Sequence, residues 1–419
     1  MANKTPAPAP TAPHTGTRLH RFRARLRAMF ERRRPSDAAT PAPQQDAAPP
    51  AADLPAAHAD AAPHAAHHAA PAHPPHATPA HPPQAAPAAP PAHHQHQHAE
   101  TVTPAAPPPL ADARTVTGTA RSSDGATAPW LLLPPERAYR LYVPPRAADA
   151  GAMPLVMMIH GCRETAEEFE RGTRMNAIAA REGFAVLYPD QATFANIRRC
   201  WNWFEPNTAA GHGECAILLE MINRARDELA VDVTRVCVAG MSSGGALAGL
   251  LAYHHPEVFA AAAVHSGLPP MMPPSAAAAI SAMEKGVKVD AEALADAYWN
   301  THGVLPPALL VLHGDEDARV TERNATSMVR LWERLYESAP LARQLDRETR
   351  DVPADGNARA YTRTDLLRDG RIVIRGVRIH GLAHAWSGGD AELPFNDARG
   401  PDASAMIWRF FERQVREAE

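Results

Sequence analysis

The chain has few cysteines, no long apolar run and little net charge, and each absence narrows its class. Four cysteines in 419 residues are too few for a disulfide scaffold. No stretch is apolar enough to form a transmembrane helix, and no apolar core follows the basic N-terminal segment as it would in a secretory signal. The net charge of −4 gives no reason to expect a specific nucleic-acid partner. These absences predict a cytoplasmic protein without a signal peptide or membrane span.

Large apolar residues are also scarce in residues 35–116, where Pro, Ala and His predominate. Such a segment cannot bury enough surface to offset the entropy of folding, so we predict a disordered linker that is partly polyproline II. Residues 1–17 are predicted to be disordered as well. The His-rich run 93–98 is suited to weak nickel or zinc binding but has no fixed geometry, so we expect no functional metal site and no cofactor.

Between these two segments, residues 18–34 alternate apolar and basic side chains. The apolar ones recur at helical spacing, and arginines fill much of the remaining surface; they are Leu19, Phe22, Leu26, Met29 and Phe30. We predict a basic amphipathic helix, which can lie on an anionic membrane or on a lipid-like granule. Nucleic-acid binding, an unstructured basic tail and a transit peptide are the alternatives.

Strand-like and helix-like patterns alternate in residues 117–419, which we predict to be one catalytic domain. The expected strands are 139–143, 155–159, 185–188, 235–239, 260–264, 309–312 and 372–377. The expected helices are 165–181, 216–228, 323–337 and 404–416, with another beginning at Ala246. This alternation predicts an α/β fold with a mostly parallel sheet flanked by helices.

Ser242 stands inside a G-x-S-x-G motif, Gly240-Met-Ser-Ser-Gly244, directly after the apolar run 235–239. In an α/β-hydrolase the nucleophilic serine occupies a sharp turn between a strand and a helix, and the flanking glycines let the backbone make that turn. The chain therefore matches the α/β-hydrolase fold at this point, with Ser242 as the nucleophile.

A serine nucleophile needs a histidine base and an acid, which follow it in that fold in the order serine, acid, histidine. The strand 309–312 ends in a segment with two acids, Asp315 and Asp317, and we favour Asp317 at the outer bend of the loop. The later strand is followed by His380 and His384, and we favour His384 because it lies in a loop of small residues. His160 and His313 each precede a glycine at a strand end, and we expect them to hold loops by hydrogen bonds.

The remaining requirement is a pair of backbone N–H groups that stabilise the oxyanion. The apolar run 155–159 leads into His160-Gly-Cys162, which matches the H-G motif after the third strand of these enzymes. We predict the N–H groups of Cys162 and Ser243 as the two donors.

Seven short motifs, in this order, resemble the poly(3-hydroxybutyrate) depolymerase family of esterases from about Thr117 to the C-terminus. They are His160-Gly-Cys162, Cys200-Trp-Asn-Trp203-Phe, Gly213-Glu214, Gly240-Met-Ser-Ser-Gly-Gly245, His313-Gly-Asp-Glu-Asp317, His384-Ala-Trp386 and Asp397-Ala-Arg-Gly-Pro401-Asp-Ala. The resemblance implies Ser242, Asp317 and His384 as the triad and hydrolysis of short-chain polyhydroxyalkanoate. It also implies a Cys162–Cys200 bridge, which a cytosolic location would disfavour. Feruloyl and acetyl-xylan esterases share this family shape, so esters of that type are the alternative substrates.

Several side chains near these motifs have two interpretations. Trp201, Trp203 and Trp386 are candidates for lining the substrate site, although tryptophans pack into cores as often. Glu214 is expected to stabilise the first turn of a helix rather than to position a loop. The segment 268–300 is a candidate cap over the substrate cleft.

The motifs predict a serine esterase that needs no cofactor. The basic helix and the absence of a secretory signal lead us to expect that it acts on storage granules through residues 18–34. Two further classes stay open from the sequence. One is an acyltransferase, which uses the same serine but passes the acyl group to an alcohol. The other is a binding scaffold for a granule or membrane surface, which has no need for a complete triad.

Overall fold

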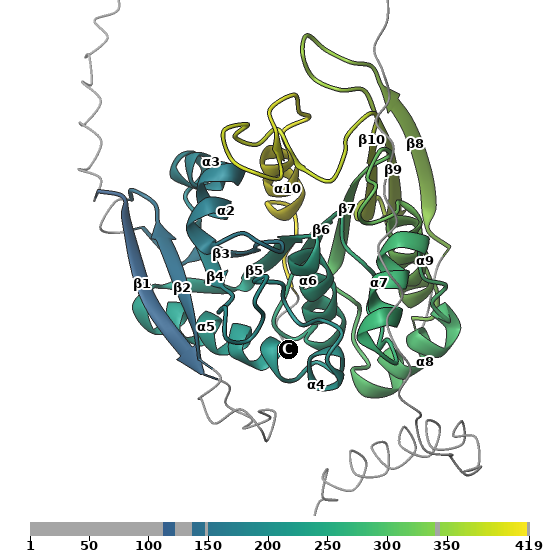
Figure 1. The fold of residues 1–419 in the computed structure, drawn as a ribbon, viewed down its shortest axis with the longest axis horizontal. Helices are drawn as coiled ribbons and strands as arrows, with labels where there is room; N and C mark the ends of the chain where they lie inside the picture. Colours follow the sequence, from purple (N-terminus) through teal and green to yellow (C-terminus); the bar gives the residue numbers. More distant parts are fainter. Residues whose placement is uncertain (1–111, 122–135, 147–149, 340–343, 417–419) are drawn as a thin grey trace, which may run out of the picture. The chain divides into compact units, whose positions relative to one another are not determined.

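The computed structural model of the chain describes residues 112–121, 136–146, 150–339 and 344–416. The predicted helix 18–34 and nearly all of the linker 35–116 lie outside the described residues. Within the described ranges, ten strands form one sheet in the order β1-β2-β4-β3-β5-β6-β7-β10-β9-β8 (Figure 1). The strands are β1 Arg114–Arg121, β2 Glu136–Val143, β3 Met153–Ile159, β4 Ala185–Asp190, β5 Val231–Met241, β6 Ala261–His265, β7 Ala308–Gly314, β8 Asp346–Val352, β9 Tyr361–Arg368 and β10 Arg371–Ile379. The first strand begins three residues before the predicted domain boundary at 117.

The centre of the sheet is parallel and its two ends are antiparallel. The run β4-β3-β5-β6-β7-β10 pairs parallel throughout. The strands β1 and β2 on one side, and β9 and β8 on the other, extend it with antiparallel pairings. The predicted parallel sheet is therefore confirmed at the centre, and the seven predicted strands match seven of the strands found.

Helices cover both faces of this sheet. They are α2 Ala166–Thr173, α3 Met175–Glu182, α4 Pro206–Ala209, α5 Glu214–Glu228, α6 Ser243–His254, α7 Ala276–Lys285, α8 Ala291–Thr301, α9 Arg323–Glu337 and α10 Ala403–Phe411. A short parallel pair, β11 Trp386–Ser387 with β12 Asn396–Asp397, lies outside the main sheet. Among the described residues, no helix is long and apolar enough to cross a membrane.

Alternate side chains of the central strands feed two separate apolar cores. Leu155 and Met157 of β3 belong to the core under α5, α6, α8 and α9. Val156 and Met158 belong to the core under α2, α3 and α10. A strand that is buried on both faces reads as a continuous apolar run, which is why these strands were predictable.

One predicted helix is two. The expected helix 165–181 breaks at Arg174, which adopts a left-handed conformation with φ of 55° and separates α2 from α3. Thr165 caps α2 reciprocally with Glu168, as a capping box does. The candidate cap segment 268–300 forms α7 and α8, and α8 packs against α9: Trp299 Nε1 donates a hydrogen bond of 2.8 Å to Leu335 O.

Candidate active site

Ser242 lies at the turn between β5 and α6. Its φ of 56° and ψ of −119° fall in a strained region for a residue with a side chain. Its N–H donates to His265 O over 2.9 Å, which ties the turn to β6. Gly244 permits the start of α6 to approach the end of β3 closely, because a Cβ at Gly244 would lie 2.2 Å from Ile159 O. The turn therefore has the strained strand-to-helix geometry of a nucleophile elbow.

The two candidate acids each pair with one of the two candidate histidines. His384 Nδ1 lies 2.7 Å from Asp317 Oδ2, and the side chains of both are nearly or completely buried. His380 Nδ1 lies 2.9 Å from Asp315 Oδ2, but the His380 side chain is 41% exposed. The pair chosen from the sequence is thus the buried one of the two, and the structure brings its members into direct contact.

The surroundings of Asp317 keep it ionised. Burial acts to raise its pKa, but the hydrogen bond and charge of His384 and the N–H of Val320 outweigh this and lower the pKa to about 2. Its other oxygen accepts from the N–H groups of Arg319 and Val320, each at 2.9 Å. An ionised carboxylate only accepts, so His384 Nδ1 carries the proton and Nε2 is left as the acceptor that a general base needs.

His265 connects the serine turn to the histidine loop and was not singled out from the sequence. Its carbonyl oxygen holds Ser242, while its Nε2 accepts from the N–H of Ser387 at 3.3 Å. Its ring stacks on Trp386 with centroids 5.1 Å apart. Burial, followed by the charges of His313 and His384, lowers the pKa of His265 to about 3, so it stays neutral. The signal available was its position at the end of the predicted strand 260–264, the sheet edge at which Ser242 and Asp317 were also expected.

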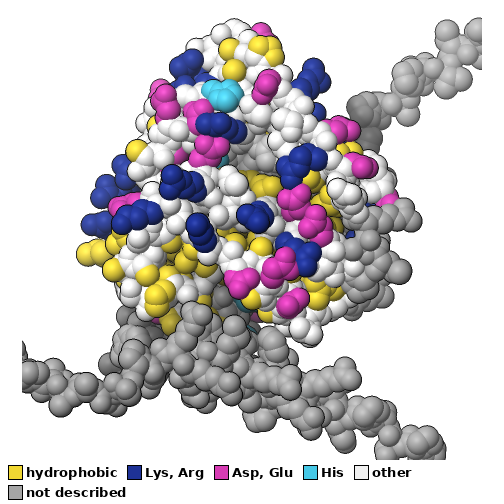
Figure 2. Space-filling view, turned by 90° about the vertical axis from the view of Figure 1, so that its right-hand side faces the viewer, with side chains coloured by type: hydrophobic (Ala, Val, Ile, Leu, Met, Phe, Trp, Pro, Cys, Tyr) yellow, Lys and Arg dark blue, Asp and Glu magenta, His cyan; other side chains and the backbone are white. Residues whose placement is uncertain are grey.

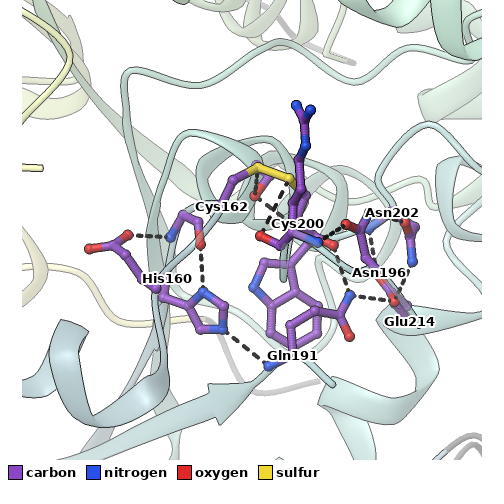
Figure 3. The surroundings of a disulfide bond; sticks show 12 residues. His160, Cys162, Gln191, Asn196, Cys200, Asn202 and Glu214 are labelled. Carbon is purple, nitrogen blue, oxygen red and sulfur yellow. Dashed lines mark hydrogen bonds between the residues drawn. A yellow bond between two sulfur atoms is a disulfide. The ribbon is translucent and has the colours of Figure 1, made fainter. Parts of the chain in front are cut away.

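The two residues predicted to supply the oxyanion donors, Cys162 and Ser243, touch through their side chains. Ser243 is the first residue of α6, and the first amides of a helix have no partner within it. The Ser243 hydroxyl lies 3.5 Å from Cys162 Sγ and accepts from the N–H of Trp201 at 3.3 Å. Cys162 and Cys200 form a disulfide, as the resemblance implied (Figure 3).

A buried polar network holds the loop that contains Cys200, and Glu214 is its centre. Glu214 accepts from the N–H of Asn202 at 2.7 Å and from Gln191 Nε2 at 2.7 Å (Figure 3). It also pairs with Arg137 Nη2 at 3.0 Å. Gln191 also donates to Cys200 O at 3.0 Å. Glu214 does open α5, yet its carboxylate contacts the loop, so the expected stabilisation of the helix end is corrected to loop positioning.

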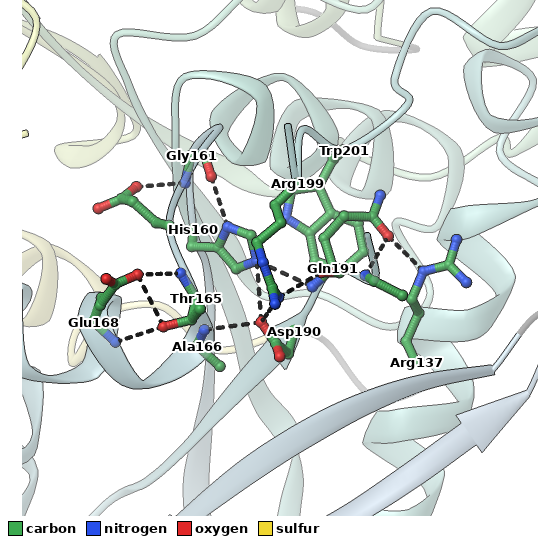
Figure 4. A network of polar contacts seen from close by, with 12 residues as sticks. Arg137, His160, Gly161, Thr165, Ala166, Glu168, Asp190, Gln191, Arg199 and Trp201 are labelled. Carbon is green, nitrogen blue, oxygen red and sulfur yellow. Dashed lines mark hydrogen bonds and ion pairs between the residues drawn. The ribbon is translucent and has the colours of Figure 1, made fainter. Parts of the chain in front are cut away.

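His160 holds the loop after β3 by hydrogen bonds, as expected. Its Nε2 accepts from the N–H of Gln191 at 3.1 Å, so its Nδ1 carries the proton and donates to Gly161 O at 2.6 Å (Figure 4). Burial lowers the pKa of His160, which favours this neutral tautomer. His313 likewise donates from Nε2 to Val320 O at 2.7 Å. Neither histidine is arranged as a general base.

Glu164 is a buried acid next to the nucleophile that was also missed. It accepts from the N–H of Gly161 at 2.8 Å and is 4% exposed. A Cβ on Gly161 would lie 2.9 Å from Glu164 Oε2 and 3.4 Å from Ser242 Cβ, so the carboxyl group and the serine flank the same glycine. Burial, opposed by the Gly161 N–H and assisted by Glu168, raises the pKa of Glu164 to about 8. A single glutamate two residues beyond an H-G-C motif gives no sequence signal for this environment.

The three tryptophans proposed to line the substrate site are almost completely buried. Trp201, Trp203 and Trp386 are 0%, 4% and 1% exposed. Trp386 packs edge-on against Phe169 and stacks on His265. This burial favours the packing interpretation, in which these rings belong to the core next to the site and do not contact substrate. Among the described residues, no cluster of His, Cys, Asp and Glu is arranged to hold a metal ion.

Comparison with known proteins agrees with this geometry. Residues 137–351 match the family described as esterase PHB depolymerase. Poly(3-hydroxyalkanoate) depolymerase C of Paucimonas lemoignei is 32% identical over 180 residues, which are 42% of this chain and 43% of that protein. Feruloyl esterase B of Thermothelomyces thermophilus is 29% identical over 216 residues, which are 48% of this chain and 70% of that protein. The match thus spans less than half of the depolymerase.

Among solved structures, an acetyl xylan esterase from Aspergillus awamori superposes with a TM-score of 0.52 at 19% sequence identity. The superposition covers 70% of this chain and 99% of the esterase. At this identity the likeness shows a shared fold, which is the α/β-hydrolase fold expected from the sequence.

Proposed function

The matched residues 137–351 make up just over half of the chain, which therefore belongs to the PHB depolymerase family of esterases, and we propose that it hydrolyses carboxylic esters through an acyl-enzyme on Ser242. The observation that carries the proposal is the buried contact of 2.7 Å between His384 Nδ1 and Asp317, which prepares His384 Nε2 to accept a proton. The fixed turn at Ser242 supports the assignment of the nucleophile.

In the proposed reaction, Ser242 Oγ attacks the carbonyl carbon and gives its proton to His384 Nε2. The N–H groups of Cys162 and Ser243 stabilise the oxyanion. The intermediate collapses, the ester C–O bond breaks, and His384 protonates the departing alcohol. A water molecule, deprotonated by His384, then attacks the acyl-enzyme and releases the carboxylic acid and free Ser242. Asp317 holds the histidine and stabilises its protonated form throughout.

We propose short-chain polyhydroxyalkanoate as the substrate. The loop 191–200 is the evidence for a polymeric substrate, because it carries two exposed apolar side chains. Phe194 is 49% exposed and Ile197 is 88% exposed. The end of this loop is covalently joined to Cys162, the proposed oxyanion donor. Apolar side chains that project beside a reactive centre suit contact with an apolar solid better than capture of a small soluble ester.

The deciding experiment measures release of 3-hydroxybutyrate from amorphous poly(3-hydroxybutyrate) granules, with p-nitrophenyl butyrate as the soluble ester. We expect activity on both, and Ser242→Ala abolishes both. Ile197→Ser is expected to lower the granule rate severalfold and leave the soluble rate unchanged. Val233→Ser is the matched control, since Val233 is 41% exposed at the start of β5, the opposite end from Ser242. Equal effects of the two variants on granules would refute the role of the loop.

The second candidate is an esterase that acts on feruloyl or acetyl groups of plant polysaccharide. It is favoured by the likeness to feruloyl esterase B and to the fold of an acetyl xylan esterase. Serine-dependent hydrolysis of methyl ferulate or acetylated xylan, without release from granules, selects this candidate. Activity on none of these esters contradicts the proposed hydrolase function itself.

We also propose that residues 18–34 attach the protein to a granule or an anionic lipid surface in the cytoplasm. The support is the sequence pattern of arginines and apolar residues alone. Removing residues 1–34 is expected to release the protein from isolated granules and leave the soluble esterase rate unchanged. Retention of the truncated protein on granules would contradict the attachment.

The Cys162–Cys200 disulfide provides a separate test of this location, because disulfides persist mainly in oxidising compartments. Acid-quenched cells, denatured and alkylated without reductant, should give two labelled cysteines if the pair is bridged, namely Cys215 and Cys237. Labelling at all four positions places the protein in a reducing compartment. Labelling at two positions argues against the cytoplasm.

A further inference from the structure

Strand β8, Asp346–Val352, forms one edge of the ten-stranded sheet. It pairs with β9 along its whole length, and the structure gives it no second neighbour among the described residues. Six of its seven side chains are exposed, and the seventh, Val352, is half-buried. An edge strand presents a row of backbone N–H and C=O groups to which another strand can pair. In Figure 1, β8 is the outermost strand on this side of the sheet.

On β8, charged residues at equal distances from Thr349 carry opposite charges. Arg347 and Glu348 precede it as a positive and a negative charge, and Arg350 and Asp351 follow as a positive and a negative charge. Because side chains alternate along a strand, Arg347, Thr349 and Asp351 share one face, and Glu348 and Arg350 share the opposite face. The contacts agree: Arg347 reaches Glu333 of α9 at 2.6 Å, and Thr349 Oγ1 lies 3.2 Å from Thr364 Oγ1 of β9.

We propose that β8 pairs antiparallel with β8 of a second copy of this chain, about a two-fold axis through Thr349. In this register Arg347 faces Asp351 of the second copy, and Glu348 faces its Arg350. The two-fold axis repeats both pairs, so all four charged pairs across the interface are of opposite sign. Residues directly opposite in an antiparallel pair lie on the same face of the sheet, so these side chains meet.

The order of the charges selects this register. A slip by one residue puts Asp346 against Asp351 in one direction and Glu348 against Asp351 in the other. A slip by two residues puts Glu348 or Arg350 against its own copy. Each of these arrangements sets like charges directly opposite, which is destabilising. Parallel pairing in register places every charged residue opposite its own copy, so like charges meet at every charged position.

A charged edge strand is also a known means of preventing edge pairing, and this is the competing explanation. Charges in any order would protect the edge of the sheet from pairing. Protection alone therefore does not explain why the charges of β8 are complementary to those of a second β8. Figure 2 faces the side of the molecule on which β8 lies in Figure 1 and shows acidic and basic side chains interspersed there. Such a surface does not repel a second copy as a surface of one sign would.

The proposed contact is small, so the dimer is expected to be weak. A single seven-residue strand pair falls below the size of standard stable interfaces. We therefore expect sedimentation velocity of the full chain to show a mass that rises from monomer to dimer with concentration. High salt should shift the transition to higher concentration, because the cross-strand pairs lie at the surface.

Two single charge reversals test the register. Glu348→Arg places positive charges at both position 348 and position 350, and Arg350→Glu places negative charges at both. Each variant alone is therefore expected to stay monomeric at concentrations where the wild type is dimeric. An equimolar mixture of the two should restore dimers, because each pair across the interface is again of opposite sign. The double variant, with both reversals in one chain, should dimerise like the wild type.

The controls separate this proposal from misfolding and from the esterase function. Both positions are exposed and lie away from Ser242, so each variant should keep the wild-type rate on a soluble ester, or the wild-type thermal unfolding curve if the chain hydrolyses none of the esters tested. A wild type that remains monomeric at all concentrations would overturn the proposal. Single variants that dimerise as the wild type does, or a mixture that fails to, would also overturn it.

Discussion

The buried acid Glu164 should make both the stability and the activity of this protein sensitive to pH, and Glu164→Gln should remove that sensitivity. Glutamine has nearly the same shape, is neutral at every pH, and keeps an oxygen that accepts from the Gly161 N–H. The side chain is 4% exposed, and burial raises its pKa from 4.5 to about 8. The variant therefore changes charge without leaving a cavity.

The effect on stability follows from the direction of this shift. Between pH 4.5 and about 8 the folded protein keeps Glu164 protonated while the unfolded chain has lost the proton. The folded state binds more protons there, so the free energy of unfolding falls as pH rises through this window and levels off above it. With about 1.4 kcal/mol for each pH unit of difference in pKa, the loss is on the order of 5 kcal/mol. The Glu164→Gln variant should lack this loss.

The effect on activity follows from the position of the carboxyl group. A Cβ placed on Gly161 would lie 2.9 Å from Glu164 Oε2 and 3.4 Å from Ser242 Cβ, so these two atoms are within about 6 Å of each other. An ionised Glu164 would repel the negative charge that develops on the substrate oxygen. At about 7 Å and an effective dielectric constant of about 20, this repulsion is about 2 kcal/mol, or roughly a 30-fold lower rate.

The assay measures kcat/KM on a soluble ester from pH 6 to 10, and urea unfolding at pH 5, 7 and 9. Wild-type kcat/KM should fall above pH 8, and Glu164→Gln should hold its rate and be the more stable protein at pH 9. Glu167→Gln is the matched control, since that carboxylate lies three residues further along the chain, on α2, and is 65% exposed. Identical pH profiles for wild type and Glu164→Gln, or a Glu164→Gln variant less stable than wild type at pH 9, would refute the reasoning.

Three further substitutions test other contacts of the site. Asp317→Asn should lower kcat by about 10⁴-fold with little change in KM or melting temperature, because the histidine loses the partner that fixes its tautomer; a loss below tenfold in steady-state kinetics would contradict the triad. His265→Phe should cost about 1–3 kcal/mol in urea unfolding, because the Ser387 N–H loses its acceptor. Since burial lowers the pKa of His265 to about 3, wild type should also lose more stability than this variant as pH falls from 6.5. Gly244→Ala should destabilise the fold by more than about 3 kcal/mol, because the new Cβ would meet Ile159 O at 2.2 Å; a stable, active variant would show that the turn can relax.

The parts of the fold that were predictable from the sequence are those whose signal is local. The buried central strands read as apolar runs, and the serine motif carries its own turn glycines. Strand β8 was not predicted, because five of its seven residues are charged, six are exposed, and the strand gives no apolar alternation. The break between α2 and α3 was also not predicted. Arg174 takes a left-handed conformation there, and an arginine in the sequence gives no signal for that conformation.

The contacts around the candidate site were harder to predict because they join residues far apart in the chain. The pairing of Asp317 with His384 could be expected from the order of motifs. Two hydrogen bonds depend on how strands and loops meet in space: the one from the Ser242 N–H to His265 O, and the one from the Asn202 N–H to the Glu214 carboxylate. Tryptophans near a motif do not reveal whether they face the substrate or the core, and here they are buried.

The loop after β3 shows why Cys162 is the residue of that motif best placed to stabilise an oxyanion. Three successive backbone N–H groups lie on this loop. That of Gly161 donates to Glu164 at 2.8 Å, and that of Arg163 donates to Arg198 O at 2.7 Å. Among the described residues, the N–H of Cys162 between them has no acceptor. The neighbouring bonds and the disulfide therefore fix Cys162, whose N–H is left unused, beside Ser243, the arrangement that a preorganised oxyanion site requires.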